Sequence, residues 1–370
     1  MYSDIMDNKY LIKRLNKIFK GTDLDAILIY NQDYPLIDSN FFYLTDFTSG
    51  LFESSFLIAF RDHIEVATGS LEYENAILEA NSSMEINEIH DVKSIQKFLK
   101  TNLKGLKVGY NEKLMPTYYY KLFKRDSYAK GYYGASKYLY NARAIKDELE
   151  INRIKNAVKI TKKSLTEIQD YFNLGITEKE LAAQFNYLQM KNGADRNSFD
   201  SIVSFDKNTA LPHHSPDATK LRANSVVLLD VGAKVKNYCS DITRTFFYKP
   251  DLKSKKYRRL KDIYDTVSYA QQLGLKNIYS KQNGKNVYNK VNEFINKSNN
   301  GIYNGKFIHS LGHMIGIDVH DADPTALSNV DLTLKNNMIM SDEPGIYING
   351  FGGVRIEDDV VIQNGKGKFL

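Results

Sequence analysis

The sequence predicts an α/β protein with two domains, and three observations support this prediction. Helical and strand-like segments alternate through the first part of the chain, as they do when helices cover a sheet. The pattern changes around residues 141–147, where one long helical stretch begins. Beyond it, helix pairs and strands alternate again to the C-terminus. We therefore expect an α/β N-terminal domain over residues 1–143 and a second, α+β domain over residues 144–370.

The N-terminal domain is predicted to begin with an amphipathic helix over residues 1–20, because its apolar side chains recur close to helical spacing. A run of β-branched and aliphatic residues at 25–30 predicts a buried strand. A second helix is expected at about 91–103. Further β-branched and aromatic runs predict strands at 41–47, 54–60, 63–68 and 106–110.

The second domain is predicted to begin with a long helix at 146–172, which ends at Gly175 because glycine accepts the left-handed cap conformation. Thr177 followed by Glu180 has the spacing of a capping box and marks the start of another helix. A further helix pair is expected over roughly 254–297. The remaining apolar runs predict strands at 198–205, 226–230, 242–248 and from 306 to the end.

Composition narrows the class of protein. The 370 residues include 50 basic and 44 acidic side chains, a net charge of +6 that is too diffuse to indicate a nucleic-acid partner. The single cysteine, Cys239, cannot form an intramolecular disulfide. No stretch reaches the 18 or so apolar residues of a membrane helix, and residues 1–20 lack the uninterrupted apolar core of a secretory signal. We expect a cytoplasmic protein without a membrane partner.

The most informative feature is a set of five short stretches in roughly the last 140 residues, each of which offers one metal ligand. The stretches are LLDVGA, SDITRTF, HSLGHMIGIDVH, DEPGIY and GVRIEDD. Four carboxylates and one imidazole suit a pair of hard or borderline divalent cations. The sequence therefore predicts a dinuclear metal site whose ligands are Asp230, Asp241, His313, Glu343 and Glu357.

Two hairpins can bring the four carboxylates together. Asp230 and Asp241 lie on two predicted strands that a turn at about 233–238 separates, and alternation along strands allows both to share one sheet face. Glu343 and Glu357 flank a second pair, which the glycine-rich segment 349–353 connects. Each acid lies beside apolar residues, where a carboxylate is costly to bury unless it is paired. Two dications in such a cavity lie about 3.5–4 Å apart and hold a shared hydroxide.

The five stretches, in this order and at these spacings, resemble the pita-bread metallopeptidases, the family of methionine aminopeptidase, aminopeptidase P and prolidase. The match covers roughly residues 146–370, and the strand pattern of residues 40–60 is similar to the front domain that aminopeptidase P and prolidase share with creatinase. The resemblance implies a creatinase-like N-terminal α/β domain. It also implies a catalytic domain with a curved, mainly antiparallel sheet flanked by helices, in a homodimer or larger homo-oligomer.

The resemblance assigns each metal ligand a role. Asp241 and Glu357 would bridge two divalent ions, Asp230 would complete one ion, and His313 with Glu343 would complete the other. Glu343 would also carry the proton of the attacking water to the leaving amine, as general base and then acid. Mn²⁺ is the favoured ion, with Co²⁺, Fe²⁺ and Zn²⁺ as alternatives because affinity alone does not select among them.

Three further histidines and one arginine are expected in the site by the same resemblance. His213 and His320 would bind the scissile carbonyl and stabilise the oxyanion. His309 would line the pocket for the residue after the scissile bond. Arg355 would hold bridging carboxylates through charge-assisted hydrogen bonds and lie at the substrate, whereas His214 is interpreted as a neighbour only.

The expected activity is hydrolysis of the Xaa-Pro bond at the N-terminus of peptides, through attack by a metal-bridging hydroxide. Prolidase, which cleaves Xaa-Pro dipeptides, is the alternative. Relatives of that type are described as binding the dipeptide carboxylate with an arginine between the metal histidine and EPG, and this chain has only Lys335 as a cation from 314 to 342. A peptidase-like binding module without activity is less favoured because all five ligands are present. Phe205, Ser310 and Met314 stand where relatives often have small residues or glycine, which affects specificity.

Overall fold

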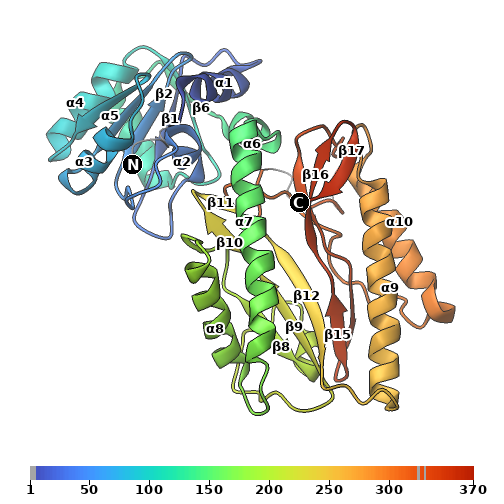
Figure 1. The fold of residues 1–370 in the computed structure, drawn as a ribbon. Helices are drawn as coiled ribbons and strands as arrows, with labels where there is room; N and C mark the ends of the chain where they lie inside the picture. Colours follow the sequence, from blue (N-terminus) through green and yellow to red (C-terminus); the bar gives the residue numbers. More distant parts are fainter. Residues whose placement is uncertain (1–5, 323–325, 329–330) are drawn as a thin grey trace. The chain divides into compact units, whose positions relative to one another are not determined.

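The computed structural model describes residues 6–322, 326–328 and 331–370. The chain divides into two compact units, Met1–Arg143 and Ala144–Leu370. Figure 1 shows the helices and strands of each unit in sequence colours. Within the described ranges, none of the helices is both long enough and apolar enough to span a bilayer.

The first unit contains one mixed sheet, in the spatial order β4-β3-β2-β1-β5-β6. The pairs β3–β4, β1–β5 and β5–β6 are parallel, and β2 is antiparallel to both of its neighbours. Its strands are β1 (Ala26–Tyr30), β2 (Phe56–Ala59), β3 (Ile64–Thr68), β4 (Met84–Glu88), β5 (Lys107–Tyr110) and β6 (Gly131–Gly134).

Helices cover this sheet, as the alternating pattern predicts. Apolar side chains of α4 and α5 pack against those of β1, β2 and β5 in one cluster. The predicted N-terminal helix is confirmed over its described part as α1. The helices of this unit are α1 (Asn8–Phe19), α2 (Ser39–Thr45), α3 (Ser70–Glu79), α4 (Val92–Leu103), α5 (Thr117–Ser127) and α6 (Ser136–Ala144).

The strand predicted at 41–47 is wrong, because residues 41–45 belong to helix α2, which ends at Thr45. The Asp38 side chain accepts a hydrogen bond from the backbone N–H of Asn40 and so caps the helix start, and Asp46 adopts the left-handed conformation that ends it. Phe41, Tyr43 and Leu44 are buried on this short helix. Aromatic residues that favour strands are used here to fill the core beside β1.

The second unit has two similar parts, each built from a helix pair and antiparallel strands (Figure 1). In the first part, α7 (Glu148–Glu167) packs against α8 (Glu178–Lys191) and against β10 and β11. The predicted capping box of Thr177 and Glu180 is confirmed. The strands of this part are β7 (Arg196–Asn197), β8 (Ile202–Phe205), β9 (Ser225–Val231), β10 (Ala233–Val235), β11 (Tyr238–Cys239) and β12 (Ile242–Tyr248).

In the second part, α9 (Lys255–Asn277) and α10 (Gly284–Lys297) pack together and contribute to a large apolar core with the C-terminal strands. The strands are β13 (Ile339–Asp342), β14 (Gly345–Ile348), β15 (Gly352–Arg355), β16 (Asp358–Gln363) and β17 (Lys366–Phe369). The strands predicted from residue 306 to the end are confirmed from Ile339 onward. The prediction is wrong for the described residues between 306 and 338, which form turns and isolated bridges. Short 3₁₀ turns lie at Ile168–Tyr171, Asp206–Ala210 and Ser298–Gly301.

Cys239 lies on β11 and is completely buried, with its Sγ 3.5 Å from the carbonyl oxygen of Ile317. Burial raises the pKa of this thiol above its usual value. The side chain therefore acts as a small apolar core residue.

Candidate metal centre

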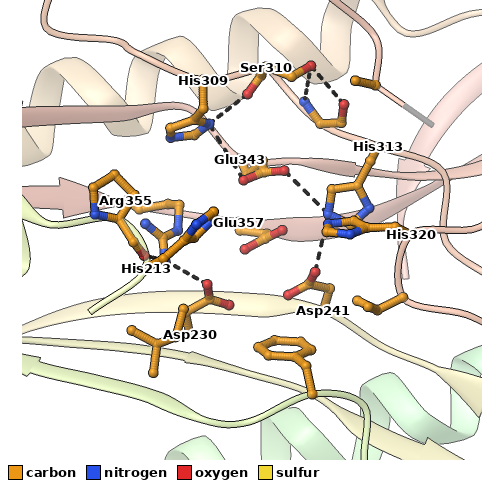
Figure 2. A pocket seen from close by; sticks show the side chains of 16 residues that line it. His213, Asp230, Asp241, His309, Ser310, His313, His320, Glu343, Arg355 and Glu357 are labelled. Carbon is orange, nitrogen blue, oxygen red and sulfur yellow. Dashed lines mark hydrogen bonds and ion pairs between the residues drawn. The ribbon is translucent and has the colours of Figure 1, made fainter. Parts of the chain in front are cut away.

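A cavity of about 410 Å³ in the second unit gathers all the residues that the sequence assigns to the site. Figure 2 shows their side chains converging from several elements. The five predicted metal ligands and the three further histidines line it together with Arg355. The other lining residues are Phe199, Ile202, Pro212, Ser310, Gly312, Val319 and Ala326.

The strand pair β9–β12 places the first two carboxylates. Thr243 pairs with Asp230 and Ile242 with Val231, so Asp230, Thr243 and the adjacent Asp241 share one face of the ribbon. The turn predicted between them is narrower than expected. It is centred on Lys236 and Asn237, both with positive φ, and the flanking residues form β10 and β11.

The C-terminal strands place the other two carboxylates at a break between two ladders. Asp342 pairs with Asp358 in β13–β16, and Gly345 pairs with Arg355 in β14–β15. Glu343 and Glu357 lie in the gap between these ladders, where Pro344 has no N–H to continue the pairing. Both carboxylates can therefore leave the sheet and point into the cavity (Figure 2).

His313 completes the set. Its Nδ1 lies 3.3 Å from the carbonyl oxygen of Met314, so Nδ1 carries the proton and Nε2 presents a lone pair. That Nε2 lies 3.4 Å from an oxygen of Asp241 and 3.5 Å from an oxygen of Glu343. Ligand atoms of Asp241, His313 and Glu357 all lie within 4.8 Å of one another. A lone pair that faces carboxylates at this spacing suits a cation between them.

Burial and mutual repulsion make the carboxylates difficult to ionise without a cation. Burial, followed by Glu357 and Asp230, raises the pKa of Asp241 well above its usual value. Burial, followed by Glu343 and Asp230, does the same to the pKa of Glu357. Burial lowers the pKa of His313 to about 4, which keeps the imidazole neutral as a metal ligand requires.

Three of the predicted ligands also carry oxygens that need a partner. Oδ1 of Asp230, Oδ1 of Asp241 and Oε1 of Glu357 are buried and accept no hydrogen bond from the residues described in the structure. A buried acceptor without a partner is costly, and a pair of divalent cations would satisfy all three. The donor set therefore fits the predicted ions.

Arg355 connects the acidic cluster to a neutral network. Its Nη2 donates to Oδ2 of Asp230 at 2.6 Å, its Nε donates to Thr243, and its Nη1 donates to the Tyr347 hydroxyl at 2.8 Å. Thr243 in turn donates to Oε2 of Glu357 at 2.6 Å. The arginine therefore binds Asp230 directly and reaches Glu357 only through Thr243. Its predicted role of holding the bridging carboxylates stays a prediction.

His309 lies at the other end of this network. Its Nδ1 lies 2.7 Å from the carbonyl oxygen of Ser310, so it donates there, and its Nε2 accepts from the Tyr347 hydroxyl at 2.8 Å. Burial lowers the pKa of His309 and raises that of Tyr347 to about 12. Both groups are neutral near pH 7. Tyr347 was not predicted as a site residue, although it belongs to the DEPGIY stretch.

His213 and His320 line the cavity and are exposed to solvent, and Figure 2 shows their side chains. The ring of His320 stands edge-on to His313, with centroids 4.2 Å apart. Burial, followed by the two neighbouring histidines, lowers the pKa of His320 to about 4. A neutral imidazole at this position can donate one hydrogen bond to a substrate oxygen.

Phe205, Ser310 and Met314, which stand where relatives often have small residues or glycine, differ in their surroundings. Phe205 is fully buried and does not line the cavity, so it packs rather than narrowing the cleft. Met314 is buried in the core behind His313. Ser310 lines the cavity and donates to the carbonyl oxygen of Gly312 at 2.9 Å.

Comparison with known proteins identifies the family. The sequence profile of Metallopeptidase family M24 matches residues 152–364, and that of the Creatinase/Prolidase N-terminal domain matches residues 12–145. The chain belongs to family M24. It is therefore a hydrolase of a metallopeptidase family, with the creatinase-like front domain and the pita-bread fold that the sequence predicts.

Several relatives of this M24 chain align with it over nearly their whole length. The chain is 32% identical to an uncharacterized peptidase of Methanocaldococcus jannaschii, over 96% of this chain and 92% of that one. The Xaa-Pro dipeptidase from Bacillus anthracis superposes with a TM-score of 0.85 at 28% identity, covering 98% of this chain and 97% of that chain. The X-Pro aminopeptidase from Thermotoga maritima also gives 0.85 at 28% identity, covering 95% and 97%. The M24 relatives thus include both activities.

Proposed function

We propose that this M24 chain is an Xaa-Pro aminopeptidase that removes the N-terminal residue from peptides with proline at the second position. The observation that carries the choice is the charge of the cavity wall. Among the residues described, Arg355 is the only lysine or arginine that lines the cavity, and it is bound to Asp230 and Tyr347. The carboxylate of a dipeptide would therefore lack a cationic partner, whereas a longer peptide continues beyond the proline as a neutral amide.

The residues of the cavity support hydrolysis of a peptide bond. Two divalent cations, when bound, would supply a water of lowered pKa as the nucleophile and polarise the scissile carbonyl. Asp230, Asp241, His313, Glu343 and Glu357 would hold them. Glu343 would accept the proton of that water and pass it to the leaving amine. In the metal-free protein, burial raises the pKa of Glu343 above its usual value.

The histidines would bind the substrate. His213 and His320 would donate hydrogen bonds to the scissile carbonyl, where negative charge develops. His309, held by Tyr347 and Ser310, would line the space for the proline residue. Mn²⁺ is the ion we propose, because four oxygen donors and one imidazole suit it.

A peptide panel tests the specificity. With Mn²⁺ present, we expect kcat/KM for Ala-Pro-Ala to exceed that for Ala-Pro by more than about 10-fold, the effect of one contact worth 1.4 kcal/mol. Ala-Ala-Ala is the control for the proline requirement. A preference for Ala-Pro would instead establish prolidase activity, which the dipeptidase relatives also support.

Two measurements test the rest of the proposal. A metal-supplemented sample that retains no divalent ion in elemental analysis would favour the inactive binding module. Light scattering tests the proposed homodimer or larger homo-oligomer, for which the family resemblance is the support.

A further inference from the structure

Glu178 lies outside the cavity but binds the chain segment that contributes Pro212 and His213 to the cavity lining. This residue is the first of helix α8, and its side chain is fully buried. Its Oε1 accepts from the backbone N–H of Phe205 at 2.7 Å and from Nδ2 of Asn208 at 3.0 Å. Its Oε2 lies 2.7 Å from Nε2 of His214 and accepts from the backbone N–H of Asp217 at 3.0 Å. One carboxylate thus binds four residues of the segment 205–217.

The last part of this segment, residues 211–217, is here called the histidine loop and carries His213, which lines the cavity. The loop includes Pro212 and Pro216, which have no backbone N–H to donate. Leu211 is 53% exposed, so the loop lies at the surface. The bonds from His214 and Asp217 to Glu178 therefore tie it to helix α8, while Arg355 approaches the carbonyl oxygen of Pro212 at 3.5 Å from the cavity side.

The ring of His214 does not line the cavity, because it is hydrogen-bonded to Glu178. A carboxylate only accepts hydrogen bonds, so Nε2 of His214 must carry a proton and donate. Its side chain is only 11% exposed. The adjacent residue His213 is exposed at the cavity and lines it. The pair of histidines therefore divides two tasks, with one ring buried as an anchor and the next presented to the cavity.

Glu178, His214 and Asp217 also lie close enough to suggest a metal site. The hydrogen bonds argue against that interpretation. Both Glu178 oxygens already accept two donors each, which uses the lone pairs of the carboxylate. Asp217 accepts from the backbone N–H of Thr219 at 2.6 Å and is exposed. The cluster is complete as a hydrogen-bonded anchor.

We propose that Glu178 and His214 are positioning residues that set the place of His213 in the substrate site. The expected loss of kcat/KM rests on the proposed function. The expected loosening of the histidine loop rests on the hydrogen bonds alone. Without the anchor, the fold and the metal ligands remain, but His213 samples orientations that do not reach the scissile carbonyl.

The first test compares His214→Ala with His214→Gln. The alanine variant removes the donor to Glu178 and should lower kcat/KM on Ala-Pro-Ala by about 10–100-fold, the effect of losing an outer hydrogen-bond partner. The glutamine variant places an amide N–H near the former Nε2 and should recover most of this loss. Equal loss in both variants would contradict the anchoring role.

A matched control separates the anchor from general damage to helix α8. Glu180 lies two residues along and is exposed, and its carboxylate accepts hydrogen bonds from the backbone N–H and the hydroxyl of Thr177 within the capping box. Glu178→Gln should therefore lower kcat/KM as His214→Ala does, while Glu180→Gln should leave it within about two-fold, the effect of a change in helix capping alone. A similar loss in both glutamine variants would overturn the proposal.

A double-mutant cycle tests whether the anchor acts through His213. If it does, His214→Ala should cost little once His213 is already alanine, because neighbouring residues in one unit are not additive. If the fold-losses of kcat/KM multiply in His213→Ala/His214→Ala, His214 acts independently of His213, and the positioning role is contradicted.

Hydrogen exchange provides a readout that needs neither metal nor turnover. In the metal-free protein, the amide of Asp217 should exchange at least about 10-fold faster in His214→Ala than in wild type, since its bond to Glu178 loosens. Unchanged exchange would refute the anchor even if the kinetics change. Faster exchange in a protein that hydrolyses no Xaa-Pro peptide would retain the anchor and reject the proposed function.

Discussion

At the scale of single residues, Asp241 shows why this cavity requires cations. Its carboxylate is buried beside Glu357, Asp230 and Glu343, and one of its oxygens has no partner in the described structure. The other oxygen faces a histidine whose lone pair points toward it. Each of these contacts is unfavourable in the metal-free protein and becomes favourable when a dication lies between the groups.

Asp241→Asn should therefore have opposite effects on activity and on metal-free stability. We expect kcat/KM to fall by more than roughly 100-fold, the upper end for loss of an outer partner, because a neutral amide bridges two cations poorly. In chelator, the same variant should melt higher than wild type, by about 2–4 °C for each kcal/mol of relieved repulsion. Calorimetry with and without Mn²⁺ measures this, and wild-type turnover in the variant would show that Asp241 does not bridge.

At the scale of elements, close backbone approach keeps the carboxylates in register. A Cβ at Gly232, between β9 and β10, would lie 2.0 Å from the carbonyl oxygen of Ser240. Ser240 directly precedes Asp241, so the connection between β11 and β12 that carries Asp241 touches the end of the strand that carries Asp230. The absence of a side chain at Gly232 therefore sets the spacing of the two acids.

Gly232→Ala should force these strands apart. We expect a loss of stability of about 1–3 kcal/mol, as for other overpacked sites, together with weaker Mn²⁺ binding in isothermal titration calorimetry. Gly69→Ala is the control, since a Cβ there meets nothing within 4 Å and its φ is ordinary. Tight Mn²⁺ binding by Gly232→Ala would indicate that the ligands do not depend on this contact.

The elements also show what the sequence could and could not predict. Capping signals were reliable, because Thr177 and Glu180 interact locally. Phe41–Phe47 was predicted wrongly as a strand because its aromatic composition outweighed the cap at Asp38. The five stretches that resemble the family supply all the predicted ligands, and these ligands line one cavity, although their roles stay predictions. Glu178 carried no such signal, because its partners lie 27 to 39 residues away in the chain.

At the scale of the whole molecule, bound metal should determine how stable the protein is. The second unit surrounds a buried cluster of like charges, whereas its apolar core of α9, α10 and the C-terminal strands lies to one side. A ligand that binds only the folded state stabilises it in proportion to its occupancy. The acidic centre is therefore a point where metal supply and folding are coupled.

Removal of metal by a chelator should abolish hydrolysis and lower the melting temperature. Adding free Mn²⁺ at about 100 times its Kd should restore about 2.7 kcal/mol, or roughly 5–10 °C for a domain of this size. The melting temperature of Asp241→Asn is the comparison, and it should change less than that of the wild type when Mn²⁺ is removed or added. A wild-type melting temperature that ignores both chelator and Mn²⁺ would mean that the cluster is not a metal site.

The burial of Cys239 has a practical consequence. The chain has no tryptophan and no other cysteine, and a thiol that is fully enclosed resists labelling reagents. One cysteine introduced at the exposed Leu211 would thus be the sole reactive thiol, and one tryptophan there the sole indole. The surroundings of the histidine loop during turnover can accordingly be monitored by the fluorescence of one probe, without first removing any native side chain.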